Sequence, residues 1–196
     1  MLLGLLLSCF SDPEPTVALI LHMEGSPSPE QVTETQAVLL ERVHAIGLHG
    51  KVDLVEGDLQ VGIACDRCDL GTVKTVLLRP GKIEIGEEGF EHPTLTNEHL
   101  ASAEITDDLE GMPAVTLVFT DKGAKAFAEL TTRIVDEKLA IVVDGTVVSA
   151  PVVMEPIVGG KAQIMGTESD VRSLAWVLDS GALPVTLTLS EERSLP

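Results

Sequence analysis

The stretch Leu-Ala-Ile-Val-Val-Asp-Gly-Thr-Val-Val, residues 139–148, decides the fold of the second half of the chain. Two runs of apolar and β-branched residues flank Asp144-Gly145, and both positions of that dipeptide tolerate the positive φ angles of a tight turn. The pattern therefore predicts a β-hairpin with strands at 139–143 and 146–148.

Regular elements are predicted on both sides of this hairpin. Phe127, Leu130 and Ile134 recur at spacings of three and four within residues 120–137, which indicates an amphipathic helix. The other elements predicted for this half are strands at 103–106, 114–119, 159–165 and 185–189 and a helix that begins near 167–170 and ends at Gly181. The second half is therefore expected to mix strands and helices.

The first half has its own order of elements. Ser28-Pro29-Glu30-Gln31 is a capping-box start, and the helix that it opens is expected to end at Gly47. The other predicted elements are a strand at 16–23, a hairpin at 51–56 and 59–64, a helix within 69–78 and an edge strand at 82–85. This β-α-β-β-α-β order is typical of a ferredoxin-like split sheet.

The predicted fold class is therefore α+β, with two subdomains. A ferredoxin-like base is expected at residues 16–91 and a second α+β head subdomain at 95–193. The segment 86–92 is rich in glycine and acid, as expected of a boundary between them.

Composition excludes several classes of protein. The 196 residues are 44% hydrophobic, enough for a folded core, but only 3% aromatic. With 13 basic against 31 acidic residues, the net charge is −18. Such a chain repels phosphate backbones, so nucleic-acid binding is not expected.

The amino terminus is a short apolar run that ends in Leu6-Leu7-Ser8-Cys9. It is too short to span a bilayer, which needs about 20 residues. Its end resembles a bacterial lipoprotein signal, so Cys9 is a candidate lipidation site, and we expect the true start to lie further upstream. A frayed apolar terminus that packs on the domain remains the alternative. Residues 11–15 are polar and Pro-rich, as expected of a tether.

Several ordered motifs in residues 95–193 resemble one known family. They are Phe119-Thr120-Asp121-Lys122-Gly123-Ala124-Lys125-Ala126-Phe127, Leu139-Ala140-Ile141-Val142-Val143-Asp144-Gly145, Val148-Ser149-Ala150-Pro151, Ile157-Val158-Gly159-Gly160, Ile164-Met165-Gly166 and Leu178-Asp179-Ser180-Gly181-Ala182-Leu183-Pro184. Together they are similar to the first periplasmic domain of SecD, a membrane protein of Sec-dependent export. The first half resembles that family only in its order of elements.

The resemblance implies a function without catalysis. It implies an extracytoplasmic, periplasmic domain without a cofactor, whose partners are unfolded or translocating polypeptide and Sec export components. Full-length members carry six transmembrane helices with the charged residues that couple proton flow to export, and this sequence has none of these helices, so proton-driven work is not expected. A lipid anchor at Cys9 would be its only membrane attachment. A structural envelope lipoprotein is an alternative.

Cys65-Asp66-Arg67-Cys68 lies where a predicted strand gives way to a predicted helix. A helix amino terminus lowers the pKa of a thiol, so a periplasmic thiol-disulfide oxidoreductase that uses Cys65 and Cys68 is the enzymatic alternative. The neighbouring carboxylates Asp66 and Asp69 oppose that shift. A local disulfide between the two cysteines, or a pair of inert thiols, is the preferred interpretation.

A metal site is the less obvious option. In a split sheet, His44, His49, Cys65 and Cys68 would lie at the same end and offer a Cys2His2 set to zinc. Oxidation of the thiols removes two of these ligands, so we expect no metal. Gly159-Gly160-Lys161 is not a phosphate loop, since Glu155 and Ala162 occupy the positions that need glycine and a hydroxyl.

Overall fold

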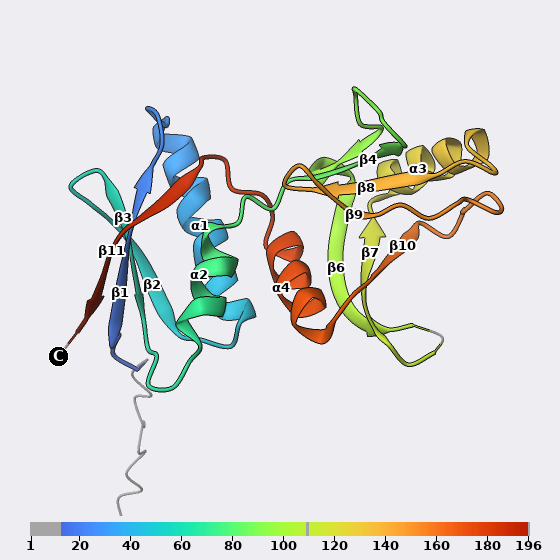
Figure 1. Ribbon diagram of the computed structural model, residues 1–196. Helices are drawn as coiled ribbons and strands as arrows, with labels where there is room; N and C mark the ends of the chain where they lie inside the picture. The colour runs from blue at the N-terminus through green and yellow to red at the C-terminus, as the bar shows by residue number, and fades with distance from the viewer. Residues whose placement is uncertain (1–12, 109, 196) are drawn as a thin grey trace, which may run out of the picture.

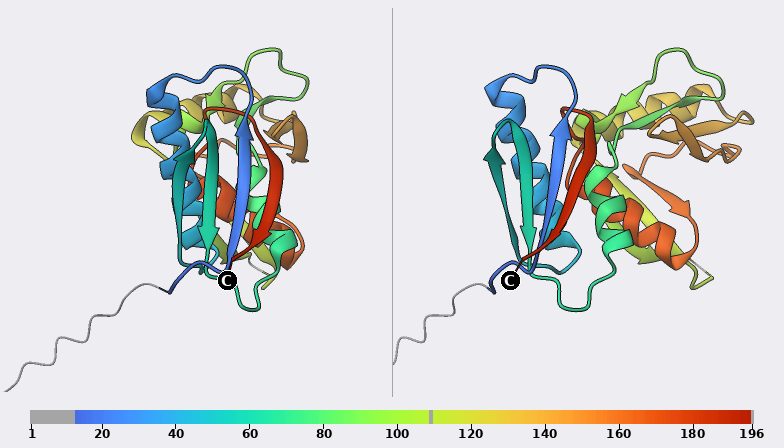
Figure 2. Two further views of the ribbon diagram at one scale, coloured as in Figure 1. Left: turned by 90° about the vertical axis from the view of Figure 1, so that its left-hand side faces the viewer. Right: turned by 60° about the vertical axis from the view of Figure 1, so that its left-hand side comes forward.

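The computed structural model describes residues 13–108 and 110–195 (Figure 1). Its first part, the base unit, is an antiparallel four-stranded sheet in the order β11-β1-β3-β2. The strands are β1 (Val17–Met23), β2 (Gly50–Val55), β3 (Asp58–Ile63) and β11 (Leu187–Ser194). Helices α1 (Pro29–Ala45) and α2 (Leu70–Leu78) cover one face of this sheet (Figures 1 and 2).

Local signals in the base unit act as the sequence predicts. Ser28 and Gln31 form both hydrogen bonds of the capping box at the start of α1. Gly47 has a φ of 77° just after the helix, the left-handed conformation that ends it. The hairpin between β2 and β3 is also present, but it turns at Glu56 and Gly57, with φ angles of 54° and 95°, one residue earlier than predicted, because Asp58 already pairs with Val55.

The second part, the head unit, contains two sheets around one core. Their orders are β10-β7-β6 and β5-β4-β8-β9. The strands are β4 (Ile83–Glu87), β5 (Leu95–Thr96), β6 (Leu100–Asp107), β7 (Pro113–Phe119), β8 (Leu139–Val143), β9 (Thr146–Ser149) and β10 (Lys161–Met165). Helices α3 (Asp121–Arg133) and α4 (Glu168–Asp179) and the 3-10 helix η1 (Asn97–His99) complete it.

Apolar side chains from both sheets and both helices fill the head core. Phe127 on α3 lies in the centre and is fully buried, with Phe119 against it at a ring-centroid distance of 4.8 Å. Asp144 and Gly145 have φ angles of 52° and 76°, which confirms the predicted hairpin turn. Helix α3 ends at Arg133, earlier than predicted, and Asp136 beyond it has a φ of 65°.

The α+β class is confirmed, but two strands lie in a different unit from the one predicted. Strand β4 was expected at the edge of the base sheet and instead pairs with β8, so that Ile83 and Ile85 enter the head core. The final strand β11 was expected in the head and instead pairs with β1. Pairing over such separations leaves no local pattern in a sequence. The division at 16–91 and 95–193 stays a prediction, since the changes of sheet fall between α2 and β4 and between α4 and β11.

One buried arginine holds both connections between the units. Arg42 on α1 is fully buried and lies where α2 and α4 end. Its guanidinium donates to the carbonyls of Val76, Leu77, Arg79, Pro80 and Gly181 and to Oγ of Ser180. Val76 and Leu77 lie in the last turn of α2, and a helix leaves its last four carbonyls without a partner inside it. Arg79, Pro80 and Gly181 lie just beyond the ends of α2 and α4. Arg42 therefore fixes the base unit to both crossings of the chain.

Burial penalises the charged form of Arg42 and lowers its pKa to about 10. The guanidinium is still protonated at neutral pH. Among residues 13–108 and 110–195, no helix has the length and apolar character needed to cross a membrane. The apolar run that ends in Cys9, with its predicted lipidation, lies outside the described residues.

Candidate functional site

A hollow of about 270 Å³ lies on the outer face of the head sheet β5-β4-β8-β9. Small residues form its floor, because Ala140 lies on β8 and Ala150 follows β9. Gly86, opposite Ala140 in β4, lies under Phe90 at the side of the hollow. Val142 and Val147, also paired across two strands, form one wall. The hollow exists because these floor positions lack large side chains.

Phe90 forms the opposite wall of the hollow. It belongs to the loop that follows β4 and folds back over that strand. A Cβ atom on Gly86 would lie only 2.6 Å from Cδ1 of Phe90. Glycine at position 86 is therefore what allows the ring to lie directly against the strand. The result is an apolar groove, lined by Phe90, Ala140, Val142, Val147 and Ala150, which we call the head groove.

The head groove borders the edge strand of its sheet. Strand β9 pairs with β8 on one side, and on its other side no backbone partner is found within the described residues. Such an edge presents unpaired N–H and C=O groups that can pair with an extended chain. The apolar groove and the open edge therefore offer two kinds of contact side by side.

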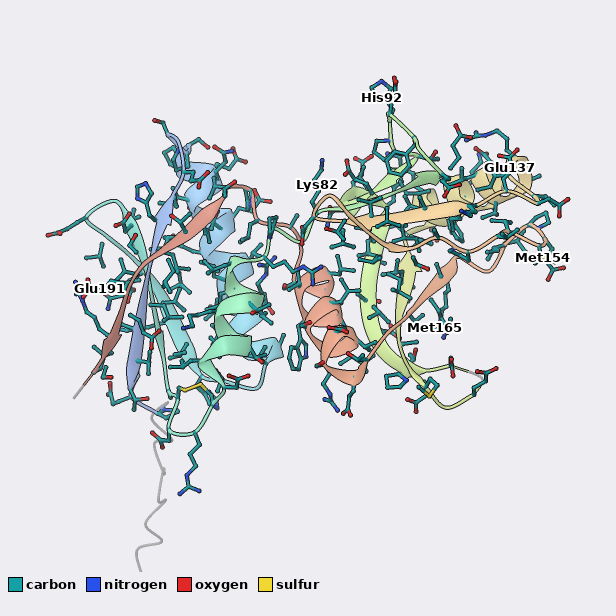
Figure 3. The ribbon with its side chains drawn as sticks, viewed as in Figure 1. Lys82, His92, Glu137, Met154, Met165 and Glu191 are labelled. Atoms are coloured by element: carbon teal, nitrogen blue, oxygen red, sulfur yellow. A yellow bond between two sulfur atoms is a disulfide. The ribbon has the colours of Figure 1, made fainter. Side chains whose placement is uncertain are left out.

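Exposed apolar side chains are concentrated in the part of the chain that begins with β9. Nine large hydrophobic side chains are exposed among the described residues, and five of them fall between residues 147 and 165. They are Val147, Val152, Met154, Val158 and Met165. Met154 lies at the end of the head unit away from the base unit, and Met165 lies on β10 (Figure 3).

Carboxylates stand at both ends of the head groove. Glu84 lies near the junction with the base unit and is 2.9 Å from Nζ of Lys82. Glu88 lies at the far end and is 2.9 Å from Nζ of Lys138. Beyond Glu88 a second hollow of about 440 Å³ is lined by Glu87, Glu88, Asp136, Glu137, Lys138 and Val152. The far end of the groove is therefore acidic, and Glu137 can be seen there in Figure 3.

The sequence pattern did not reveal the head groove. No contact residue was predicted, since the floor depends on which strands pair and in which register. The Asp-Gly hairpin signal locates β8 and β9 but says nothing about β4 beside them. Phe90 falls in the segment predicted only as a boundary. The small residues at 86, 140 and 150 acquire meaning only once Gly86 is opposite Ala140.

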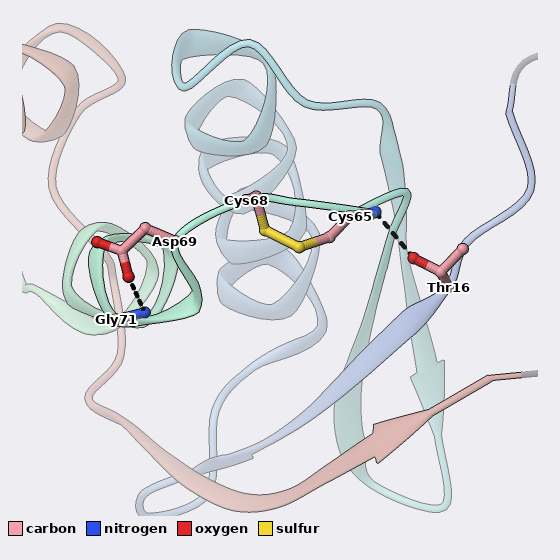
Figure 4. Close-up of a disulfide and its surroundings, with 5 residues drawn as sticks. All are labelled: Thr16, Cys65, Cys68, Asp69 and Gly71. Atoms are coloured by element: carbon pink, nitrogen blue, oxygen red, sulfur yellow. Dashed lines mark hydrogen bonds between the residues drawn. A yellow bond between two sulfur atoms is a disulfide. The ribbon is translucent and has the colours of Figure 1, made fainter.

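The structure joins Cys65 and Cys68 in a disulfide, with Cα atoms 5.3 Å apart (Figure 4). The bridge lies in the loop between β3 and α2, and the backbone N–H of Cys65 donates to Oγ1 of Thr16 at 2.9 Å. Asp69 caps α2 by accepting from the N–H of Gly71 at 3.0 Å. Hydrogen bonds from Thr72 and Gly71 lower the pKa of Asp69. A carboxylate thus already occupies the helix amino terminus that would favour a thiolate.

The four residues considered as zinc ligands do not assemble into one site. His44 and His49 line a hollow of about 300 Å³ together with Pro13, Glu14, Pro15, Gly50 and Lys51, and neither cysteine lines it. The two cysteine sulfurs are bonded to each other. Within the part of the chain that the structure describes, no group of three or more His, Cys, Asp or Glu residues is arranged to hold a metal ion.

Comparison with known proteins supplies a family. The family profile described as SecDF, P1 head subdomain, matches residues 86–185, just over half of the chain. SecD of Acidaminococcus fermentans is 46% identical over 103 residues, covering 52% of this chain and 25% of that protein. SecDF of Thermus thermophilus is 43% identical over 113 residues, covering 57% of this chain and 15% of that protein. SecD of Leptotrichia buccalis is 27% identical over 185 residues, covering 91% of this chain and 46% of that protein.

Solved structures extend the likeness to the base unit. SecDF in its super-membrane-facing form superposes with a TM-score of 0.83 at 26% identity, over 93% of this chain and 30% of that one. A second structure, of a SecDF membrane component that enhances protein export, superposes with a TM-score of 0.79 at 26% identity, over 91% of this chain and 100% of that one. The chain spans less than half the length of the three curated relatives described above.

Proposed function

This chain belongs to the family of the SecDF P1 head subdomain, and from that premise we propose that it is an extracytoplasmic component of protein export that binds extended polypeptide in the head groove. The observation that carries the proposal is the apolar hollow between Phe90 and Val147 beside the edge strand β9. One of the similar solved structures is that of a SecDF membrane component that enhances protein export, which is consistent with this role.

The chemistry of the groove suits an unfolded chain as ligand. A folded protein hides its apolar side chains and its backbone, whereas an extended chain offers both. Its backbone can pair with β9, and an apolar side chain can enter the hollow and lie against Phe90. Such binding needs no catalytic group. The proposed partners are therefore unfolded or translocating polypeptide and, through other surfaces, Sec export components.

The test is binding of a reduced and alkylated, permanently unfolded polypeptide by isothermal titration calorimetry. Val147→Ser removes an exposed wall of the groove, and Ala150→Phe fills its floor from an exposed position. Both variants are expected to weaken binding by about tenfold, since burial of one valine-sized side chain contributes about 1.5 kcal/mol. Val55→Ser, at an exposed valine on the edge strand β2 of the base unit, is the matched control. Equal loss in all three variants, or no binding by the parent chain, would refute the proposal.

Thiol-disulfide exchange is the second candidate, supported by the position of Cys65 and Cys68 just before α2. The carboxylate of Asp69 at that helix amino terminus argues against a reactive thiolate. An insulin-reduction assay on the dithiol form separates the two candidates. Turnover that disappears in Cys65→Ser would favour the enzyme, and no turnover above the free dithiol would leave polypeptide binding as the proposal.

Location outside the cytoplasm, with or without a lipid at Cys9, also remains a proposal. Incorporation of labelled fatty acid in cells, compared between the parent chain and Cys9→Ser, tests the lipid anchor directly. Loss of label and of membrane association in Cys9→Ser is the expected result for a lipoprotein. A structural envelope lipoprotein without an export role would carry the label and yet fail to bind unfolded polypeptide.

A further inference from the structure

We propose that the head groove selects extended segments in which an apolar residue is separated by one residue from a lysine or arginine. This inference deepens the proposed function and rests on it. It names the class of polypeptide that binds, from the charges and the spacing along the groove. The occupant is an extended chain that lies parallel to β8 and β9, with the apolar side chain over the floor at Ala140.

The spacing follows from the register of the sheet. Glu84 is opposite Val142, Gly86 is opposite Ala140, and the N–H of Glu88 donates to the carbonyl of Lys138. Successive rows on the outer face of β4 and β8 are therefore two residues apart, whereas the pairing of β9 with β8 shifts register between Ile141 and Val142. Two residues of an extended chain span about 6.6 Å. The spacing between rows of the sheet therefore equals the spacing between alternate side chains of an extended ligand. A side chain seated over Ala140 therefore places the side chains two positions away beside the rows of Glu84 and Glu88.

The charge at the far row decides which side chain fits there. Glu87, Glu88, Asp136 and Glu137 gather around one lysine, Lys138. Four carboxylates against one ammonium leave a net charge of −3 in this hollow. The existing pair between Glu88 and Lys138 is exposed on both sides, with side-chain exposures of 59% and 49%, so it satisfies little of this charge. A basic side chain entering from a ligand finds carboxylates on several sides.

The row of Glu84, nearer the base unit, carries a different charge from the row of Glu88. Among the described residues Glu84 forms one ion pair, with Lys82 at 2.9 Å, and its side chain is 21% exposed. One carboxylate paired with one lysine leaves this end close to neutral. The two ends of the groove therefore differ: the middle is apolar, the end at Glu88 is acidic, and the end at Glu84 is close to neutral. Since the apolar hollow and the acidic hollow share Glu88, a single ligand can occupy both.

The experiment measures binding of short fluorescent peptides to the full chain by anisotropy at low ionic strength. All peptides share a Ser/Thr-rich extended sequence with one central leucine. They differ only two residues away from the leucine, where they carry lysine, glutamine or glutamate. The lysine peptide is expected to bind about fivefold more tightly than the glutamine peptide and at least tenfold more tightly than the glutamate peptide. This advantage should largely disappear in 0.5 M salt, where the Debye length falls to roughly 4 Å.

Charge-removing variants locate the effect. Glu88→Gln and Glu137→Gln alter exposed side chains and are expected to reduce the advantage of the lysine peptide about twofold to threefold each. Glu34→Gln, at an exposed position on α1 in the base unit, is the matched control and should leave it unchanged. Circular dichroism of each variant checks that the fold is retained.

The outcomes separate this inference from the proposed function. Equal affinity for the lysine, glutamine and glutamate peptides, with binding that Val147→Ser removes, overturns the charge selection and leaves polypeptide binding intact. Binding of no peptide overturns both. A concentration-dependent dimer that Val147→Ser abolishes assigns the groove to a second copy of the chain and overturns both as well. Charge preference that persists in Glu88→Gln and Glu137→Gln together places the selection elsewhere and overturns the inference.

Discussion

Replacing Arg42 by methionine tests whether this buried arginine holds the base unit and the head unit together. Methionine has a similar length and no charge, so it fills much of the same space but donates no hydrogen bond. The change leaves the carbonyls at the ends of α2 and α4 without their donor. Because these groups are buried with the arginine, they regain little hydration in the folded state.

The expected cost follows from those contacts. Each buried carbonyl left without a donor costs about 1–3 kcal/mol, and the buried contacts to Val76 and Leu77 are both lost. The carbonyls of Arg79 and Gly181 are part-buried and lose the same donor, whereas that of Pro80 keeps the N–H of Leu183. Part of this cost is recovered, since burial of the charge is itself unfavourable and lowers the pKa of Arg42 to about 10. Breaking a buried charged interaction from one side typically costs about 3–5 kcal/mol, which we take as the net destabilisation by Arg42→Met. The total free energy of unfolding of a single domain is only about 5–15 kcal/mol.

Urea unfolding measures this loss with two probes. Trp176 on α4 is the only tryptophan of the chain and reports on the helix that carries Ser180 at its end. Far-ultraviolet circular dichroism reports on all helices and strands. The two transitions are expected to coincide in the parent chain and to separate in Arg42→Met, because the variant uncouples the base unit from the head unit.

Two controls make the experiment decisive. Arg67→Met removes an exposed arginine and is expected to change the free energy of unfolding by less than about 0.5 kcal/mol. Arg42→Lys keeps the charge but not the planar fork of donors, so it should fall between Arg42→Met and the parent chain. A loss below about 1 kcal/mol in Arg42→Met, with coincident transitions, would show that the arginine does not hold the two units together.

Three further predictions concern single features of the fold. Gly123→Ala should destabilise the head unit by at least about 2 kcal/mol in urea unfolding, because a Cβ atom there would lie on the carbonyl oxygen of His99. In an unobstructed helix the same change normally stabilises by about 1 kcal/mol. A gain in stability would therefore contradict the packing of α3 on η1. Reduction of the bond between Cys65 and Cys68 should cost only about 2 kcal/mol, since the bridge closes a very short loop, and global unfolding on adding dithiothreitol would show that it does more. An NMR titration should show the pKa of the Asp69 carboxyl below its usual value of 3.8. The stabilisation of α2 by this carboxylate is therefore present above pH 3.8 and is lost as the pH falls through the lower, folded-state pKa. A raised pKa would contradict the observed cap.

Local features of this fold were predictable because their causes lie close together in the chain. The capping box of α1 needs only Ser28 and Gln31, three residues apart. The turn at Asp144 and Gly145 needs only a dipeptide that accepts positive φ. Such features depend on the backbone of a few neighbouring residues, so no tertiary contact overrides them.

Features that depend on distant pairing were not predictable. Strand β4 carries the alternation of any edge strand, and nothing in Ile83 and Ile85 says that their partners are Val143 and Ile141. Arg42 looks like a solvent-exposed residue beside the apolar face of its helix, and it is buried by segments 34 to 139 residues away. The head groove requires the same long-range register together with the fold of Phe90 over Gly86. The disulfide partners, by contrast, are separated by three positions and were nominated from the sequence.

The most direct test of the central claim is NMR mapping of the labelled chain with an unfolded polypeptide added. Amide shifts are expected to change first and most in residues 84–90 and 138–152, around the walls and floor of the head groove. The base sheet β11-β1-β3-β2 should remain unaffected. Changes confined to the base sheet, or none at saturating polypeptide, would contradict a binding surface on the head.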